Sequence, residues 1–211
     1  RELVFESLFK GEELNSLALA KFLAERKVRS VVIGPGSMAS VLTPAVIAEL
    51  AAFTSSGNHL VVLDAGATHG ALGLLADAGV SDQNWLLTPH PGEWQKMSAH
   101  PPRAPLSHEG LQATHDIAAK IGVTLLYKHA TPVVVTGDPA VPAFVLTEGT
   151  TALARAGSGD LLAGAAAAHG AIGLSAPLAV LRAQTVVAWA AKLAGGKRGE
   201  HAVVALSLIH I

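Results

Sequence analysis

Short runs of apolar residues alternate along this chain with longer segments whose apolar positions recur at helical spacing. The short runs, rich in leucine and β-branched residues, predict strands at 28–33, 60–63, 85–87, 123–126, 133–135 and 143–146. The longer segments predict helices at 43–54, 107–122, 158–172 and 176–194. Because apolar strands are separated by helices, the pattern predicts an α/β fold whose mainly parallel central sheet is covered by helices on both faces.

Polar residues or glycines follow four of these strands, at Gly34, Asp64, Thr88 and Lys128. In a parallel sheet the ligand crevice lies beyond the carboxyl ends of the strands, so these positions predict a functional site there. Asp64 fits either an anchoring or ion-binding carboxylate or a helix cap, and the cap is the commoner role.

The composition narrows the class of protein. The chain has 211 residues, half of them apolar and 15% charged, which indicates one packed domain. A net charge of −1 argues against nucleic acid or an anionic membrane as a partner. There is no cysteine, no signal peptide is visible, and no apolar run reaches the roughly 20 residues of a membrane span. A cytoplasmic protein is the expectation.

The segment 156–164 opens an alanine-rich predicted helix with the sequence Ala-Gly-Ser-Gly-Asp. Glycines at a helix N-terminus let backbone N–H groups approach a phosphate, and the helix dipole favours negative charge there. Asp160 would face the phosphoryl group and could accept a hydroxyl proton. Small residues such as Ala163 and Gly164 would let the helix lie close to the sheet. The alternative is an ordinary glycine turn with an acidic residue at a helix start.

Two further segments hold candidate binding residues. Lys128 after a strand can balance nucleotide phosphates, although a lysine there often projects into solvent. The sequence Thr-Pro-His-Pro-Gly-Glu at 88–93 predicts a tight loop holding His90 and Glu93, suited to positioning a substrate or simply solvated. Gly34 to Gly36 lacks the dinucleotide-binding fingerprint, and the other histidines lack metal-ligand spacing, so no structural metal is predicted.

Taken in order, these segments resemble the carbohydrate-kinase-like family of NAD(P)H-hydrate dehydratases, within the ribokinase-like superfamily. The matching pieces are Val32–Gly36, Val62–Ala65, Leu87–Glu93, Lys128 with Thr131, and Leu153–Asp160. The Thr-Pro-His-Pro-Gly-Glu piece discriminates most, because related vitamin kinases tend to carry Asn at the position of His90. The resemblance implies a ribokinase-like three-layer sandwich.

The resemblance also implies an activity, the ADP- or ATP-dependent repair of hydrated NADH or NADPH. A nucleotide phosphorylates the ring hydroxyl, and the ring enamine expels phosphate. Asp160 would be the general base and contact the substrate together with Gly36 and His90. The nucleotide would lie against residues of two segments: Lys128, His129, Ala130, Thr131, Pro132, Gly157, Ser158 and Gly159. Magnesium is expected beside the nucleotide. A homo-oligomer is possible in such a family.

The chain departs from the family pattern in three places. It lacks the family's Gly/Ala-rich N-terminal segment, His129 replaces the usual Gly after the Lys, and Gly66 replaces an Asp in the sequence that follows Asp64. His129 could therefore crowd the nucleotide. We expect residues 1–205 to form the dehydratase domain and 206–211, which resembles a translated sequencing adapter, to be a non-native tail. The alternatives are a small-molecule kinase of the same superfamily, or a nucleotide-binding protein without catalysis.

Overall fold

The computed structural model describes residues 8–10, 13–37, 41–80, 84–97 and 107–208. Its main element is a six-stranded sheet in which every strand pairs with the next strand in the chain. The strands are β3 (Ser30–Ile33), β4 (Leu60–Leu63), β5 (Trp85–Leu87), β6 (Thr124–Tyr127), β7 (Val133–Val135) and β8 (Phe144–Val145). The first four strands are parallel, whereas β7 and β8 run antiparallel to their neighbours. A separate hairpin joins β1 (Phe9–Lys10) to β2 (Glu13–Leu14).

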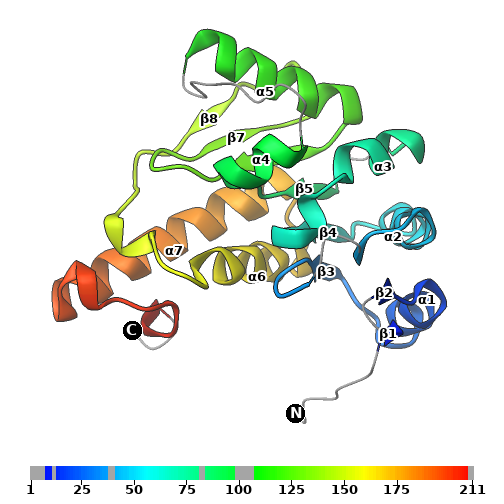
Figure 1. The fold of residues 1–211 in the computed structure, drawn as a ribbon, viewed down its shortest axis with the longest axis horizontal. Coiled ribbons are helices and arrows are strands. Elements are labelled where there is room, and N and C mark those ends of the chain that lie inside the picture. The colour runs from blue at the N-terminus through cyan, green and yellow to red at the C-terminus, as the bar shows by residue number, and fades with distance from the viewer. Residues whose placement is uncertain (1–7, 11–12, 38–40, 81–83, 98–106, 209–211) are drawn as a thin grey trace.

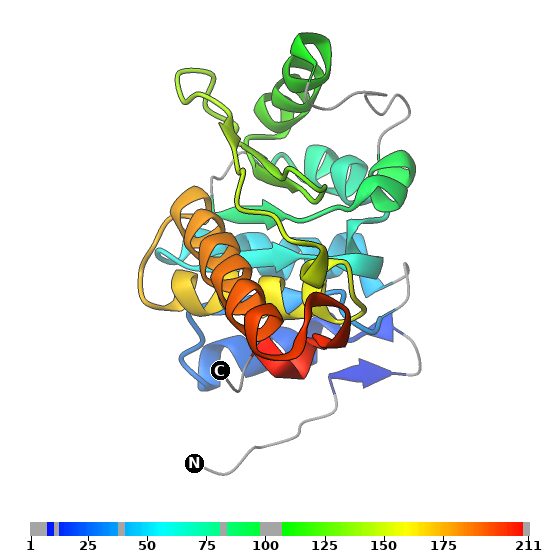
Figure 2. The ribbon, with the colours of Figure 1, turned by 90° about the vertical axis from the view of Figure 1, so that its left-hand side faces the viewer.

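Helices cover both faces of this sheet. One layer consists of α1 (Ser16–Glu25), α2 (Pro44–Ser55), α3 (Ala71–Asp77), α4 (Pro91–Met97) and α5 (His108–Ile121). The other consists of α6 (Ser158–Ala171), which lies over β3 and β4, and α7 (Ala176–Arg198), which lies over β5 to β7. The views in Figures 1 and 2 show α6 and α7 together on one side of the strands and α2 and α3 on the other. Short 3₁₀ turns occupy Ala65–Thr68, Thr151–Leu153, Glu200–Ala202 and Ala205–Leu208.

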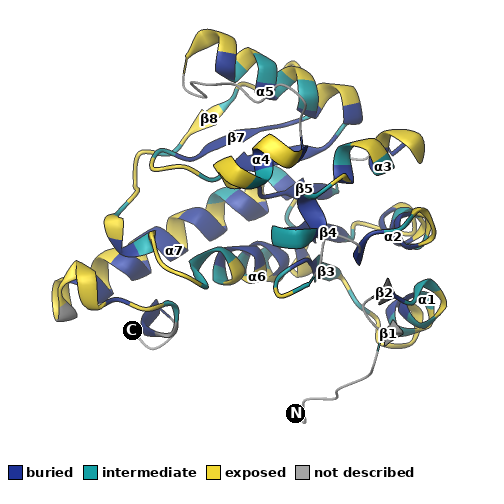
Figure 3. Cartoon of the chain, in the orientation of Figure 1, coloured by how far each residue is buried: buried dark blue, intermediate teal, exposed yellow. Residues whose placement is uncertain are grey.

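Strands β4 to β7 bury both of their faces, as Figure 3 shows for the central part of the sheet, whereas the edge strand β8 is exposed. Successive side chains of a strand point to opposite faces, so each of these four strands contributes to two apolar clusters. In β4, Val61 and Leu63 join the cluster with α1, α2 and α3, while Leu60 and Val62 join the cluster with α6 and α7. This two-sided burial explains why the strands are apolar throughout, and it confirms the predicted α/β sandwich.

Several predicted boundaries match the structure and others shift. The strands at 60–63, 85–87 and 133–135 are confirmed at their predicted bounds. The helix from Ser107 to Gly122 is also confirmed: the Ser107 hydroxyl accepts the N–H of Gly110, and Gly122 ends the helix in the left-handed conformation. The first predicted strand, however, begins at Ser30 rather than 28, and the last helix continues to Arg198 rather than 194.

The segment 88–93, predicted to be a loop, is partly helical. Pro91 begins α4, which continues to Met97. A proline fits the first position of a helix because that position needs no N–H donor, so the two prolines and the glycine did not prevent helix formation.

Residues 206–211 were predicted to be a non-native tail. Leu208 is buried in the cluster formed with α6 and α7, while 209–211 lie outside the described residues. Within the described ranges, the structure contains no helix long and apolar enough to cross a membrane.

Candidate active site

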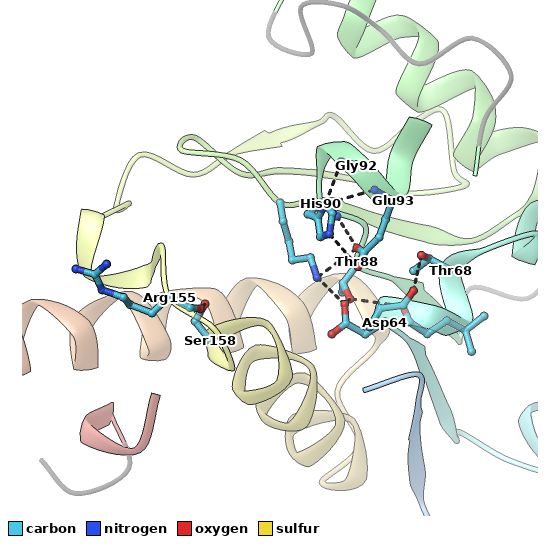
Figure 4. Close-up of polar contacts among 11 residues, drawn as sticks. Asp64, Thr68, Thr88, His90, Gly92, Glu93, Arg155 and Ser158 are labelled. Carbon is cyan, nitrogen blue, oxygen red and sulfur yellow. Dashed lines mark hydrogen bonds and ion pairs between the residues drawn. The ribbon is translucent and has the colours of Figure 1, made fainter. Parts of the chain in front are cut away.

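The carboxyl ends of the parallel strands bring Asp64, Thr88 and Lys128 together. The N–H of Asp64 donates to the carbonyl of Ile33, and the N–H of Thr88 donates to the carbonyl of Leu63, so the sheet's hydrogen bonding continues past the strand ends. Asp64 is 1% exposed. Its Oδ1 atom accepts hydrogen bonds from the Thr88 hydroxyl at 2.7 Å and from Lys128 Nζ at 2.6 Å (Figure 4).

This geometry corrects two expectations. Asp64 stands at the start of the 3₁₀ turn 65–68, but its side chain caps no N–H group there and instead holds the ammonium group of Lys128. Lys128 in turn does not project freely into solvent, since its side chain is only 19% exposed. The chain also approaches Asp64 closely at Gly34, where an added Cβ would lie 1.7 Å from the Asp64 carbonyl oxygen. Only glycine fits there.

His90 and Glu93 cap the start of α4 reciprocally. His90 Nδ1 accepts the N–H of Gly92 at 2.9 Å, and Glu93 Oε2 accepts the N–H of His90 at 2.8 Å (Figure 4). This is a capping box with an imidazole in place of the usual hydroxyl. Because Nδ1 accepts hydrogen bonds, the neutral ring carries its proton on Nε2, which lies 3.2 Å from Glu93 Oε1. Glu93 Oε2 also lies 3.7 Å from Lys128 Nζ, which links the cap to the buried ion pair.

The N-terminus of α6 lies against this ion pair. Gly157, in the left-handed conformation at φ 83°, turns the chain into the helix, and the Ser158 hydroxyl donates to the carbonyl of Arg155. A Cβ added to Gly159 would lie 3.4 Å from Lys128 Nζ, so glycine permits this close approach. The N–H groups of Gly159 and Asp160 have no partner within the described part of the chain. Two free N–H groups next to a lysine at a helix N-terminus form a suitable anion site.

Two cavities flank this helix N-terminus. The first cavity has a volume of about 810 Å³ and is lined by Gly36, Asp160, Gly164 and apolar residues of α1 and β3. The second cavity has a volume of about 710 Å³ and lies on the side of Lys128. Its lining includes Lys128, His129, Ala130, Pro132, Ser158 and Gly159. No described residue lines both cavities.

The predicted site residues therefore divide between the two cavities. Asp160, which is exposed, and Gly36 share the first cavity, as expected for a base and a substrate contact. His90, predicted to contact the same substrate, lines the second cavity instead, because its ring caps α4 beside Lys128. Thr131 and Gly157 line neither of the two cavities.

His129 forms part of the wall of the second cavity. Its ring stacks on Tyr127 with a centroid distance of 6.0 Å and an interplanar angle of 19°. Trp94 meets the same tyrosine edge-on at 5.7 Å. Tyr127 is buried, and desolvation raises the pKa of its hydroxyl above the ordinary value of 10.0.

Sequence reasoning missed two residues of this site, Arg155 and Gln184, which line the second cavity. It placed Thr88 at the site but did not predict that Thr88 hydrogen-bonds to Asp64. Thr88 belonged to a recognised segment, but its partner could be found only from the strand order. Arg155 lies just before the glycine-rich helix start, which could have drawn attention to it. Gln184 lies within a predicted alanine-rich helix and carried no signal in the sequence beyond being polar.

The side chains present determine what kind of magnesium site this region fits. No group of three or more His, Asp or Glu side chains in the described ranges could hold a metal ion. Asp64 and Glu93 are two carboxylates on either side of the Lys128 ammonium. Magnesium commonly binds one or two carboxylates together with substrate phosphates and water. This pair therefore fits an ion that arrives with a nucleotide better than a resident metal.

A sequence model of the NAD(P)H-hydrate dehydratase family matches residues 5–211, almost the whole chain. The chain belongs to the NAD(P)H-hydrate dehydratase family. It is 29% identical over 140 residues to a bifunctional NAD(P)H-hydrate repair enzyme of Methanopyrus kandleri, covering 66% of this chain and 26% of that protein. It is 33% identical over 114 residues to the corresponding enzyme of Mycobacterium leprae, covering 54% of this chain and 23% of that protein.

Solved structures of similar fold include a member of this family. An ADP/ATP-dependent NAD(P)H-hydrate dehydratase from Bacillus subtilis, co-crystallised with ATP and Mg²⁺, superposes with a TM-score of 0.67 at 24% identity. That match covers 85% of this chain and 61% of the Bacillus chain. A ribokinase-like protein from Enterococcus faecalis also has a TM-score of 0.67, at 20% identity, covering 93% of this chain and 64% of that one. The predicted ribokinase-like fold is confirmed.

This family member spans about a quarter of the length of the curated repair enzymes that it matches.

Proposed function

We propose that this chain carries out the nucleotide-dependent dehydration of hydrated NADH or NADPH. The observation that supports this best is the separation of two cavities by the first turn of α6, with Asp160 in one and Lys128 in the other. A phosphoryl group bound at the free N–H groups of Gly159 and Asp160 would lie between the two ligands. This is the arrangement that transfer from a nucleotide to a hydroxyl requires.

These positions support the following reaction. The hydrate's hydroxyl oxygen attacks the terminal phosphorus, Asp160 takes the hydroxyl proton, and the bond from phosphorus to the nucleotide's bridging oxygen breaks. The lone pair of the ring nitrogen then expels the phosphate, and loss of a proton from the neighbouring carbon restores the dihydronicotinamide ring. Lys128 and the N-terminus of α6 would offset the charge that develops on the phosphoryl oxygens.

Magnesium would enter this site with ADP or ATP. When bound, it would supply positive charge that offsets the charge of the phosphates. In this chain, Asp64 and Glu93 are the carboxylates available to it, and Asp64 Oδ2 faces the helix N-terminus, 3.9 Å from the position of a Cβ at Gly159.

The decisive experiment measures recovery of the reduced-nicotinamide absorbance from NADH hydrate with magnesium and either ADP or ATP. We expect recovery to require a nucleotide, and Asp160→Asn to lower kcat by roughly 10²- to 10⁴-fold, the usual contribution of a general base. Nucleotide affinity, measured separately by calorimetry, should change little. Asp77→Asn, at an exposed position on α3, serves as the matched control and should leave kcat unchanged.

Other outcomes would contradict the proposal. A stable phosphorylated alcohol without recovery of NADH would indicate a small-molecule kinase. Nucleotide binding with no turnover of any hydrate would indicate a binding protein. Full activity of Asp160→Asn would remove Asp160 from the role of base.

A further inference from the structure

Gln184 is a buried polar side chain without a partner. It lies on α7 between the buried residues Ala183 and Val187, and only 6% of its surface is exposed. Its amide makes no hydrogen bond within the described part of the chain. Its amide atoms are not sealed in the core, since the fully buried side-chain polar atoms that lack a partner in the described residues belong to Trp85, Trp94 and Thr124. A largely buried amide that is unpaired and lines a cavity is available to a ligand.

Gln184 lines the second cavity. It also lines an adjoining recess of about 110 Å³, which it shares with Gly159, Leu162 and Val187. Lys128, His129 and Ser158 line both spaces as well. A ligand held at the N-terminus of α6 would therefore lie within reach of the side chain of Gln184.

The lining of the second cavity has zones of different chemistry. Lys128 and the first turn of α6 provide positive charge, whereas Pro132 and Leu153 provide apolar surface. The ring of His129 is flat, stacked on Tyr127 on one side, and exposed overall. A charged zone beside a flat zone matches a phosphate joined to a planar heterocycle, because rings stack readily on aromatic side chains.

We infer that Gln184 recognises the edge of an adenine base stacked on His129. This rests on the proposed function, which places an adenine nucleotide in the second cavity. A glutamine amide pairs in two-pronged fashion with adenine, donating to a ring nitrogen while its carbonyl accepts from the amino group. Guanine presents an oxygen at the position of that amino group, so the carbonyl of Gln184 would face another acceptor. A phosphate would use only the amide's N–H groups and would offer no donor to its carbonyl.

Gln184 and His129 should affect nucleotide binding in different ways. Gln184 sets the preference for adenine, so Gln184→Leu, which keeps a similar volume, should abolish that preference. His129 supplies a stacking surface that any base can use. His129→Gly should therefore lower the affinity for all nucleotides by a similar factor. Gln184→Leu removes no hydrogen bond within the described part of the chain and keeps a similar volume, so we expect the ligand-free variant to unfold at about the same temperature as the unmodified chain.

The test is calorimetric titration of the full chain with ADP and with GDP, in magnesium. We expect the unmodified chain to prefer ADP by roughly 10- to 100-fold, the discrimination typical of a two-pronged amide contact. In Gln184→Leu the affinity for ADP should fall until the two nucleotides bind about equally. His129→Gly should weaken both nucleotides by about tenfold and keep the ratio. Thr185→Val, at the exposed neighbouring position on α7, should change neither affinity.

Three outcomes would overturn the inference. An unchanged ADP preference in Gln184→Leu would show that the amide does not recognise the base. Equal losses for ADP, GDP and inorganic pyrophosphate in that variant would assign the amide to phosphate. If the unmodified chain binds neither ADP nor ATP, the nucleotide-dependent function fails and the inference with it. If it restores NADH with ADP while Gln184→Leu keeps its selectivity, the inference alone fails.

Discussion

Asp64 and Lys128 follow strands β4 and β6, which are separated in the sheet by β5, and still form a 2.6 Å ion pair. Thr88 follows β5 between them and donates to the same carboxylate oxygen. The pair is enclosed, since Asp64 is 1% and the Lys128 side chain 19% exposed. A buried charge is tolerated when it is paired and hydrogen-bonded, so this small network keeps an ammonium group at the N-terminus of α6.

The two residues of this pair should depend on each other for stability. Lys128→Met leaves the buried Asp64 carboxylate without its cation, and we expect the free energy of unfolding to fall by about 3 kcal/mol, measured by urea denaturation. Lys192→Met provides the control, because Lys192 pairs with Glu148 on the surface, where both side chains are about half exposed. That change should cost at most about 1 kcal/mol. Equal costs for the two variants would show that burial of the Asp64 pair is unimportant.

The sequence predicted those helices and strands whose positions depend only on nearby residues. Uniformly apolar strands such as β4 and β5 needed no knowledge of their neighbours, and the ends of α5 followed from Ser107 and Gly122. α4 was missed because Pro91 and Gly92 are common in loops. Its start depends on the reciprocal cap of His90 and Glu93, which a sequence shows only as a pair three residues apart.

The candidate site could be predicted only in part for a related reason. The positions after the strands were identified because the carboxyl edge of a parallel sheet is a general binding place. Which of them touch depends on strand order, so the contact between Asp64 and Lys128 could not be read from a spacing of 64 residues. The same limit explains why the sequence did not show that His90 lies apart from Gly36 and Asp160, and why Gln184, on a distant helix, was missed.

The packing of α6 on the sheet was predicted in part. Ala163 is buried in the cluster with Leu60 and Val62, as predicted, whereas Gly164 is exposed. A further close contact, which was not predicted, lies at Gly170 near the other end of α6. A Cβ added there would lie 2.7 Å from the Cβ of Leu60, a distance that no rotation of the Leu60 side chain can relieve.

Gly170→Ala should therefore destabilise the protein although alanine favours helices. We expect a loss of about 1–3 kcal/mol, the usual cost of overpacking a core, measured by thermal or urea unfolding. Gly164→Ala in the same helix is the matched control, because an added Cβ there meets no atom within 4 Å. That variant should gain up to about 1 kcal/mol from helix propensity alone. The packing argument would fail if the two alanines had the same effect.

For the whole molecule, the important feature is that α6 stands between two cavities of similar size. One opens between α1, β3 and α6, and the other between α4, α6 and α7. Since no described residue lines both, a ligand in one cavity does not occupy the space of the other. The fold thus offers separate places for a nucleotide and for the molecule that it would phosphorylate, with the N-terminus of α6 between them.

This separation predicts that a non-hydrolysable ADP analogue and NADH, the expected product, bind together. Each ligand at a hundred times its Kd should stabilise the fold by about 2.7 kcal/mol, and the two contributions should add when both are present. Thermal shift measurements with each ligand and with both would test this. Gly164→Leu, which places a large side chain in the first cavity, should weaken NADH binding and leave the nucleotide's effect intact. Mutual displacement of the two ligands would instead mean that they share one cavity, and the assignment of Asp160 and Lys128 to different ligands would be wrong.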